Sequence, residues 1–166
     1  MIRRVISAGL VATIALGPVA AAAQCLTKNE RSALQLRALQ TELMVATLSC
    51  RSVTREDIIG HYNAFARKNA KSLSSSSQTL VRYFDRRYGA QGRKEHDSFM
   101  TALANGYSRE SMNAANFCDA SAVLLRDVAR ADDRALNALA TRRTPVNVLG
   151  AGDCAIAAVD PKKEKR

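Results

Sequence analysis

Hydrophobic residues recur at intervals of three and four along most of this chain, which is the spacing of one face of an α-helix. The first such stripe consists of Ala33, Leu36, Leu39, Leu43, Ala46 and Cys50. Thr27, with Glu30 three residues later, has the spacing of a capping box at a helix N-terminus. The pattern therefore predicts a helix over residues 27–50, with Cys50 pointing into the core.

A second stripe covers residues 54–88 and predicts a helix that opens at Thr54. Its members are Ile58, Tyr62, Phe65, Asn69, Leu73, Ser76, Leu80 and Phe84. The consecutive serines 74–77 resemble a linker by composition. However, Leu73 and Leu80 keep the same helical phase across these serines, because seven residues make about two turns. We expect one long helix that is bent or weakened at the serines, and two separate helices are the alternative.

Glycines divide the middle of the chain. Residues 89–92 predict a turn, in which Gly89 is well placed to stop the preceding helix. Residues 93–105 then predict a third helix, with Phe99 inward and an end at Gly106.

A fourth helix is expected to open near Ser108 or Ser111. Its stripe consists of Met112, Ala115, Cys118, Ala122, Leu125, Ala129, Leu136 and Leu139. Asp132 falls in the same phase and predicts a break there. The pattern fails from Thr141, so residues 141–166 are expected to form an irregular C-terminal tail.

These segments predict a single all-α domain over residues 24–140, built as an irregular up-down four-helix bundle. Composition agrees, because 47% of the residues are hydrophobic while the chain has only four Tyr, four Phe and no Trp. A core rich in alanine and leucine favours helices over a β-sheet.

The N-terminus has the layout of a secretory signal peptide. Arg3 and Arg4 precede an apolar run, and four alanines end at Ala23. We expect residues 1–23 to be removed before Gln24 and the protein to be periplasmic or secreted. An uncleaved membrane anchor and a lipoprotein lipidated on Cys25 are the alternatives.

The four cysteines predict two disulfides, because export places them in an oxidising compartment. Cys25 and Cys50 flank the first helix and lie too far apart to pair. In an up-down bundle, Cys50 would meet Cys118 and Cys25 would meet Cys154. If residues 54–88 form two antiparallel helices instead, Cys25 would pair with Cys118 and Cys50 with Cys154.

Charge points to an anionic partner. The formal charge is +10, and removal of the signal peptide leaves 23 basic against 15 acidic side chains, or +8. The densest basic stretch contains Arg82, Arg86, Arg87, Arg93 and Lys94. These residues are candidates for binding phosphate groups of a polyanion. The alternative is that the arginines only complement the end of a helix and cover the surface.

Motifs for catalysis and cofactors are missing from the sequence. It has no C-x-x-C, no H-E-x-x-H, no P-loop and no G-x-S-x-G, and its two histidines, His61 and His96, stand apart. Glu42 is a candidate buried carboxylate beside the first stripe, although a surface position is the preferred interpretation. We therefore expect no catalytic residue, no metal site and no cofactor.

Four stretches resemble a family of uncharacterised exported proteobacterial proteins. They are residues 37–46, 62–65, 83–84 and 101–105. The resemblance implies export and a helical fold, and it supplies no activity and no site residues.

The sequence thus predicts a non-enzymatic binding or envelope-associated accessory protein. Its expected partner is an anionic envelope component or another protein, and nucleic acid is not expected in the periplasm. A binder of small ligands or unfolded chains with an interhelical groove is the alternative, and a helical hydrolase is the least favoured hypothesis.

Overall fold

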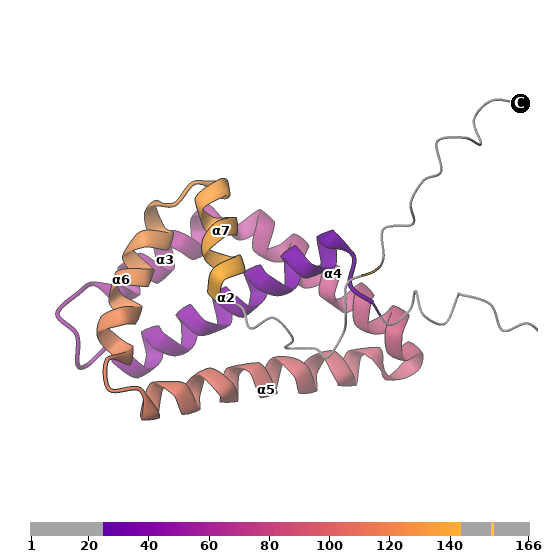
Figure 1. Ribbon diagram of the computed structural model, residues 1–166, viewed down its shortest axis with the longest axis horizontal. Coiled ribbons are helices and arrows are strands. Elements are labelled where there is room, and N and C mark those ends of the chain that lie inside the picture. Colours follow the sequence, from indigo (N-terminus) through magenta and orange to yellow (C-terminus); the bar gives the residue numbers. More distant parts are fainter. Residues whose placement is uncertain (1–24, 144–153, 155–166) are drawn as a thin grey trace, which may run out of the picture.

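A computed structural model describes residues 25–143 and Cys154, and all structural statements below concern these residues. The described chain is all-α (Figure 1). Its elements are α2 (Lys28–Cys50), α3 (Ile58–Lys68), α4 (Ala70–Tyr88), the short 3-10 helix η1 (Gly89–Gln91), α5 (Gly92–Asn113), α6 (Phe117–Arg130) and α7 (Asp133–Arg143). The predicted signal peptide and all of the predicted tail beyond Arg143, except Cys154, lie outside the described residues.

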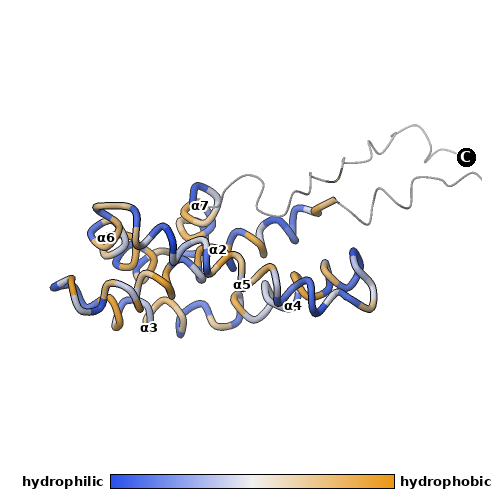
Figure 2. The backbone as a smooth tube through the Cα atoms, turned by 90° about the horizontal axis from the view of Figure 1, so that it is seen from below, coloured by the Kyte–Doolittle hydropathy of each residue, from blue (hydrophilic) through white to orange (hydrophobic). Residues whose placement is uncertain are grey.

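Helix α2 is the central element and contacts each of the five other α-helices. It begins as the sequence predicts: the Glu30 N–H donates to Thr27 Oγ1 at 3.3 Å, and the Thr27 N–H donates to Glu30 Oε2 at 2.9 Å. Leu39 and Leu43 are fully buried against α3 and α6. Figure 2 shows hydrophobic and hydrophilic positions alternating along the helices, which lets each helix cover part of the core.

Helices α2 and α5 run in the same direction, with α4 between them in the chain and running back (Figure 1). The residues in contact show this register, because Ala38 and Val45 on α2 pack with Leu103 and Tyr107 on α5. Because α2 and α5 are parallel, residues with the same spacing on the two helices lie opposite one another.

The long second helix is interrupted at Asn69, not at the serines. The Asn69 side-chain amide donates to the Phe65 carbonyl at 2.9 Å and competes with the helical backbone. The Asn69 N–H still reaches the same carbonyl at 3.0 Å, and the Leu73 N–H reaches the Asn69 carbonyl at 2.9 Å. The structure therefore has two helices, α3 and α4, separated by Asn69, and the expectation of one long helix weakened at the serines was wrong. Residues 74–77 lie inside α4.

Two predicted helix starts were wrong: α6 begins at Phe117 and not near Ser108 or Ser111, and α3 begins later than Thr54. Helix α3 begins at Ile58 with Asp57 as the cap, because Asp57 Oδ1 accepts from the Gly60 N–H at 2.9 Å. Thr54 was therefore the wrong start. The predicted break at Asp132 is confirmed, since its Oδ1 accepts from the Ala135 N–H at 2.8 Å and separates α6 from α7.

Two predicted helix ends were also wrong. Helix α5 continues through Gly106 to Asn113, because Leu103 and Tyr107 pack against α2 on both sides of the glycine. That packing outweighs the helix penalty of about 1 kcal/mol for one glycine. Helix α7 continues through Thr141 to Arg143, where an ion pair to α2 holds its last residue.

The predicted disulfide pairing is confirmed. Cys50 pairs with Cys118 at a Cα–Cα distance of 5.4 Å, and Cys25 pairs with Cys154 at 4.8 Å. The two bridges lie at opposite ends of α2. Disulfides of this kind are typical of an oxidising, non-cytoplasmic environment. Within the described residues, no helix is both long and apolar enough to span a membrane.

Candidate anion-binding site

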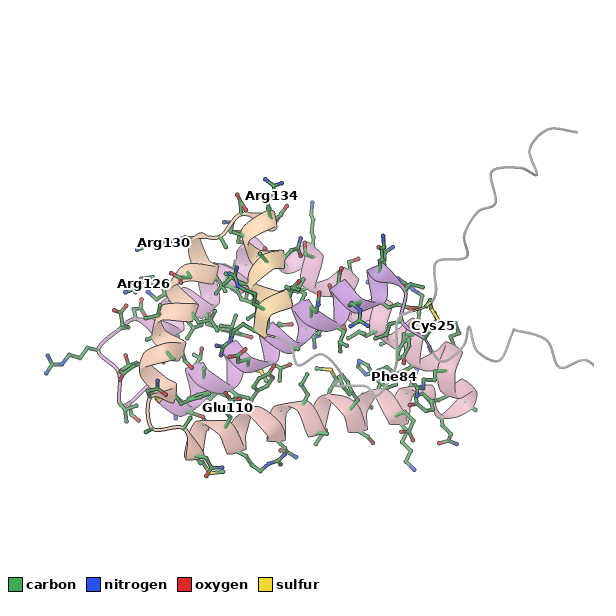
Figure 3. All side chains as sticks on the ribbon, in the orientation of Figure 1. Cys25, Phe84, Glu110, Arg126, Arg130 and Arg134 are labelled. Atoms are coloured by element: carbon green, nitrogen blue, oxygen red, sulfur yellow. A yellow bond between two sulfur atoms is a disulfide. The ribbon has the colours of Figure 1, made fainter. Side chains whose placement is uncertain are left out.

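The five basic residues singled out in the sequence lie around one end of the molecule. Arg82, Arg86 and Arg87 occupy the last turns of α4, and Arg93 and Lys94 occupy the first turn of α5. Cys25 and Phe84 mark the same end in Figure 3. We call these five residues the basic end.

The contacts of Arg86 are structural. Its guanidinium forms an ion pair with Glu30 and donates to the Cys25 carbonyl at 3.1 Å. Burial raises the pKa of Glu30, but the hydrogen bonds from Arg86 and Thr27 outweigh burial and hold this pKa below its usual value. Arg86 therefore ties α4 to the start of α2.

Two more of these arginines have partners inside the protein. Arg87 Nη1 donates to the Tyr83 hydroxyl at 2.6 Å, and its guanidinium lies 5.3 Å from the centre of the Tyr88 ring. Arg82 Nη2 donates to Thr79 Oγ1 at 3.2 Å. Arg93 and Lys94 are exposed. The basic end is thus partly a structural arrangement, as the alternative interpretation of the sequence expected.

A groove between α2 and α5 contains the side chain of Arg37, which was not among the residues predicted from the sequence. The groove has a volume of about 360 Å³. Its walls are formed by Arg37, Gln40, Thr41 and Met44 on α2 and by Met100, Thr101, Ala104 and Asn105 on α5. We call it the Arg37 groove.

Arg37 lies half-buried in this groove without a carboxylate partner. Its Nη1 donates to Gln40 Oε1, whereas Nε is buried and has no hydrogen-bond partner in the part of the chain that the structure describes. Burial lowers the pKa of Arg37, and the phenol of Tyr62 only partly opposes this effect. Buried polar groups are usually hydrogen-bonded, so a buried guanidinium Nε without an acceptor is unusual.

The sequence does contain a signal for this arginine. Positions three and four residues before and after Arg37 on α2 are Ala33, Leu34, Gln40 and Thr41. None of them is acidic, so no carboxylate on the same helix can neutralise Arg37. Only the packing of α5 shows that no carboxylate from another element fills that role.

Glu42 corrects another expectation. It is 2% exposed, not a surface residue, and forms an ion pair with Arg143 at the end of α7. Burial raises the pKa of Glu42, and the hydrogen bond and charge of Arg143 offset this only in part. The Tyr107 hydroxyl lies near this pair, and burial followed by the charges of Glu42 and Glu110 raises its pKa. Glu110 itself projects from α5 (Figure 3).

A second groove, of about 490 Å³, lies between α2, α4 and α7. Hydroxyl and amide side chains line it, including those of Ser72, Ser76 and Asn137, with Lys71 as its single charged residue. It lacks the buried, unpaired charge that distinguishes the Arg37 groove.

Within the described residues, no cluster of three or more His, Cys, Asp or Glu side chains has the arrangement of a metal site. His61 Nε2 lies 3.8 Å from Glu56, and His96 Nδ1 lies 3.3 Å from Asp97. These contacts give each histidine an ordinary carboxylate neighbour.

Comparisons of this chain with protein-family models, curated proteins and solved structures found no match.

Proposed function

We propose that this protein is an exported, non-enzymatic binding protein that takes a small anionic ligand in the Arg37 groove. The observation that carries the proposal is the half-buried Arg37 guanidinium, which has no carboxylate partner among the described residues. As the sequence predicted, the expected partner is anionic. The main proposed site, however, is the groove between α2 and α5 and not the basic end.

The physical reason is the cost of burying a charge. A guanidinium removed from water without a counter-charge destabilises the folded protein. An anionic ligand at the accessible part of the half-buried guanidinium would supply the missing counter-charge and accept a hydrogen bond from it. Hydrogen bonds to charged groups contribute about 1.5–3 kcal/mol each, so one such contact changes affinity by at least tenfold.

Export is supported by two separate observations. Residues 1–23 have the composition of a signal peptide, and the cysteines at both ends of α2 are oxidised. The oxidised cysteines offer no thiol nucleophile.

Replacement of Arg37 tests the proposal. The fluorescent anion 1-anilinonaphthalene-8-sulfonate serves as the probe, titrated into the oxidised protein. We expect Arg37→Met to weaken its binding at least tenfold, and Arg37→Lys to weaken it less. Arg134→Met, which removes an exposed cation from α7, is the matched control and should bind like the wild type.

Thermal unfolding of the same variants separates a ligand-binding role from a structural one. If Arg37 serves a ligand, Arg37→Met should raise stability by roughly 1 kcal/mol, because it removes an unpaired buried charge. Unchanged probe binding together with a lower midpoint of unfolding would show that Arg37 is a structural residue and would refute the proposal.

The basic end is a second candidate, for a polyanionic surface and not for a small ligand. Arg93 and Lys94 favour it, because both are exposed and neither forms an ion pair with a described residue.

A further inference from the structure

The groove between α2, α4 and α7 is lined by polar side chains that make no polar contacts within the described protein. We call it the serine groove. Seven of its side chains form neither a hydrogen bond nor an ion pair with another described residue: Asn29, Ser32, Lys71, Ser72, Ser75, Ser76 and Asn137. Polar groups that converge on a hollow between helices are typical of a small-molecule site.

The serine run that resembles a linker in the sequence contributes to one wall of the serine groove. The wall from α4 consists of Lys71, Ser72, Ser75, Ser76 and Thr79. The wall from α2 consists of Asn29, Ser32, Ala33 and Leu36. Residues three, four and seven positions apart share one face of a helix, so each wall is a single helix face. Such inward faces are normally apolar, and serine is a weaker helix former than alanine, so neither core packing nor helix formation accounts for these hydroxyls.

Ser76 is the buried serine of this wall, with an exposed fraction of 9%. Its hydroxyl has no hydrogen-bond partner in the part of the chain that the structure describes. The described side-chain polar atoms that are both sealed from solvent and unpartnered belong to other residues, so the Ser76 oxygen keeps accessible surface in the groove. Buried hydroxyls are usually hydrogen-bonded, so a molecule that fills the groove has to bond to Ser76.

The types of side chain indicate a ligand with several hydroxyl groups. Serine hydroxyls and asparagine amides each donate and accept hydrogen bonds. Among the described residues that line the groove there is no carboxylate, and Lys71 is the one cation. A ligand that only accepts hydrogen bonds, such as inorganic phosphate, would leave the acceptors of this set unpaired. Saccharide hydroxyls both donate and accept, and Ala33 and Leu36 offer apolar surface to the C–H groups of a sugar ring.

We propose that the serine groove binds a saccharide of one or two rings. The hydroxyls of the sugar bond to Ser75, Ser76 and Asn137, and Lys71 favours a sugar acid over its neutral counterpart. The volume of about 490 Å³ lies within the range of roughly 300–1,000 Å³ for small-molecule sites. This is a second site, separate from the Arg37 groove, and it goes beyond the function proposed for that groove.

Calorimetric titration of a panel of sugars into the oxidised protein tests the class of ligand. The panel consists of glucose, galactose, mannose, N-acetylglucosamine, maltose, glucuronate and galacturonate. We expect at least one neutral sugar to bind. Each sugar acid should bind about two- to fivefold more tightly than its neutral counterpart, which is the size of an exposed charge contact, and Lys71→Gln should abolish this difference.

Two pairs of substitutions on α4 locate the site. Ser75→Ala with Ser76→Ala should weaken the tightest neutral sugar at least fivefold, because each lost hydrogen bond changes affinity by about two- to tenfold. Ser74→Ala with Ser77→Ala is the matched control: it makes the same change on the same helix at serines outside the groove lining, and it should bind like the wild type. Both pairs should keep their helical circular dichroism, because alanine favours a helix more than serine does.

The outcomes distinguish this inference from the proposed function. Sugar binding that persists in Arg37→Met and is lost in the Ser75, Ser76 pair would support a second site, whether or not the fluorescent anion binds at Arg37. If no member of the panel binds, or if the control pair weakens binding as much as the Ser75, Ser76 pair, the saccharide site is refuted. Binding of the sugar acids alone, lost in Arg37→Met, would assign them to the Arg37 groove and refute the serine groove as a site.

Discussion

Two buried glutamates on α2 differ in the sign of their pKa shift although each is paired with an arginine. Glu30 accepts hydrogen bonds from Arg86 and from the Thr27 backbone, and its pKa is lowered although burial alone would raise it. Glu42 has Arg143 as its hydrogen-bond donor, burial dominates, and its pKa is raised. The two ion pairs therefore change the free energy of unfolding in opposite directions with pH.

The sign follows from proton binding. Because the pKa of Glu30 is lower in the folded state, the unfolded chain binds more protons, and the stability from Glu30 is lost as pH falls through its folded pKa. Because the pKa of Glu42 is higher in the folded state, the native protein binds more protons between the unfolded value and the folded pKa. Stability from Glu42 is therefore lost as pH rises through that window.

Removal of Arg143 tests the environment of Glu42. We expect Arg143→Gln to destabilise the protein by roughly 3 kcal/mol at pH 7, the low end for a broken buried pair, because Arg143 is 40% exposed. The loss should shrink as pH falls toward the ordinary pKa of a glutamate, because Glu42 then becomes neutral. Urea unfolding at pH 7 and pH 5 measures both effects.

Arg142→Gln is the control, since it removes the adjacent exposed charge. It should change stability little at either pH. An Arg143→Gln penalty that is the same at both pH values would show that its cause is lost packing and not the charge of Glu42.

At the scale of elements, the structure depends on how α2 is tied at both ends. Cys50 is buried within the main core cluster and bonds to Cys118, which packs against the same cluster. At the other end, the Cys154 N–H donates to the Leu26 carbonyl at 3.0 Å next to the second disulfide. The chain is divided at Asn69 into α3, which contacts α6, and α4, which contacts α2 and α5.

The bridge in the core should contribute measurably to stability. We expect Cys50→Ala with Cys118→Ala to lower the free energy of unfolding by about 2–5 kcal/mol, mainly because the bridge restricts the unfolded chain. Urea unfolding measured by circular dichroism gives the value. The Cys25→Ala, Cys154→Ala pair provides a comparison, and unfolding curves that superimpose on the wild type would contradict this expectation.

At the scale of the whole molecule, the basic side chains fall into two groups. Some form ion pairs that hold helices together, and others are exposed without an ion pair to a described residue. Arg86 and Arg143 neutralise buried glutamates, and Arg126 lies 3.2 Å from Glu56. Figure 3 shows Arg126, Arg130 and Arg134 on the side of α6 and α7, away from the end marked by Cys25. A test of polyanion binding must therefore remove only the cations that the fold does not use.

Replacement of Arg82, Arg93 and Lys94 by Gln, with Arg86 retained, makes this test for the basic end. If the basic end binds a polyanion, the triple variant should elute from heparin at lower salt, and wild-type binding should weaken steeply with salt because counterions are released. Replacement of Arg55, Arg109 and Arg134, which are exposed elsewhere, removes the same charge as a control. If the two triple variants elute at the same salt concentration, heparin binding depends only on net charge, and the basic end is not a specific site.

Processing of the N-terminus is a property of the whole chain as well. We expect cleavage between Ala23 and Gln24, because the alanine run follows a charged start and an apolar segment. The intact mass of the protein from its native host decides this. A mass that retains residues 1–23, or a lipid on Cys25, would favour the membrane-anchored alternatives.

The sequence by itself was enough to predict the helical class, the start of α2 and the break at Asp132, and to favour the observed disulfide pairing over its alternative. These depend on local spacing and on the alternation of helix direction, which short stretches of sequence encode. The end of α5 could not be predicted in this way, because Gly106 opposes a helix locally and only the packing of Leu103 and Tyr107 against α2 overrides it.

The candidate site depended on tertiary structure. Glu42 is neutralised by a residue 101 positions away, so its burial leaves no local pattern in the sequence. The sequence does show that Arg37 has no acidic neighbour on its own helix, but only the packed α5 shows that no other element supplies one. Local spacing determines which residues share a face of a helix. The charges and cavities between helices are decided by which faces meet, because electrostatic partners and packing surfaces come from distant parts of the chain.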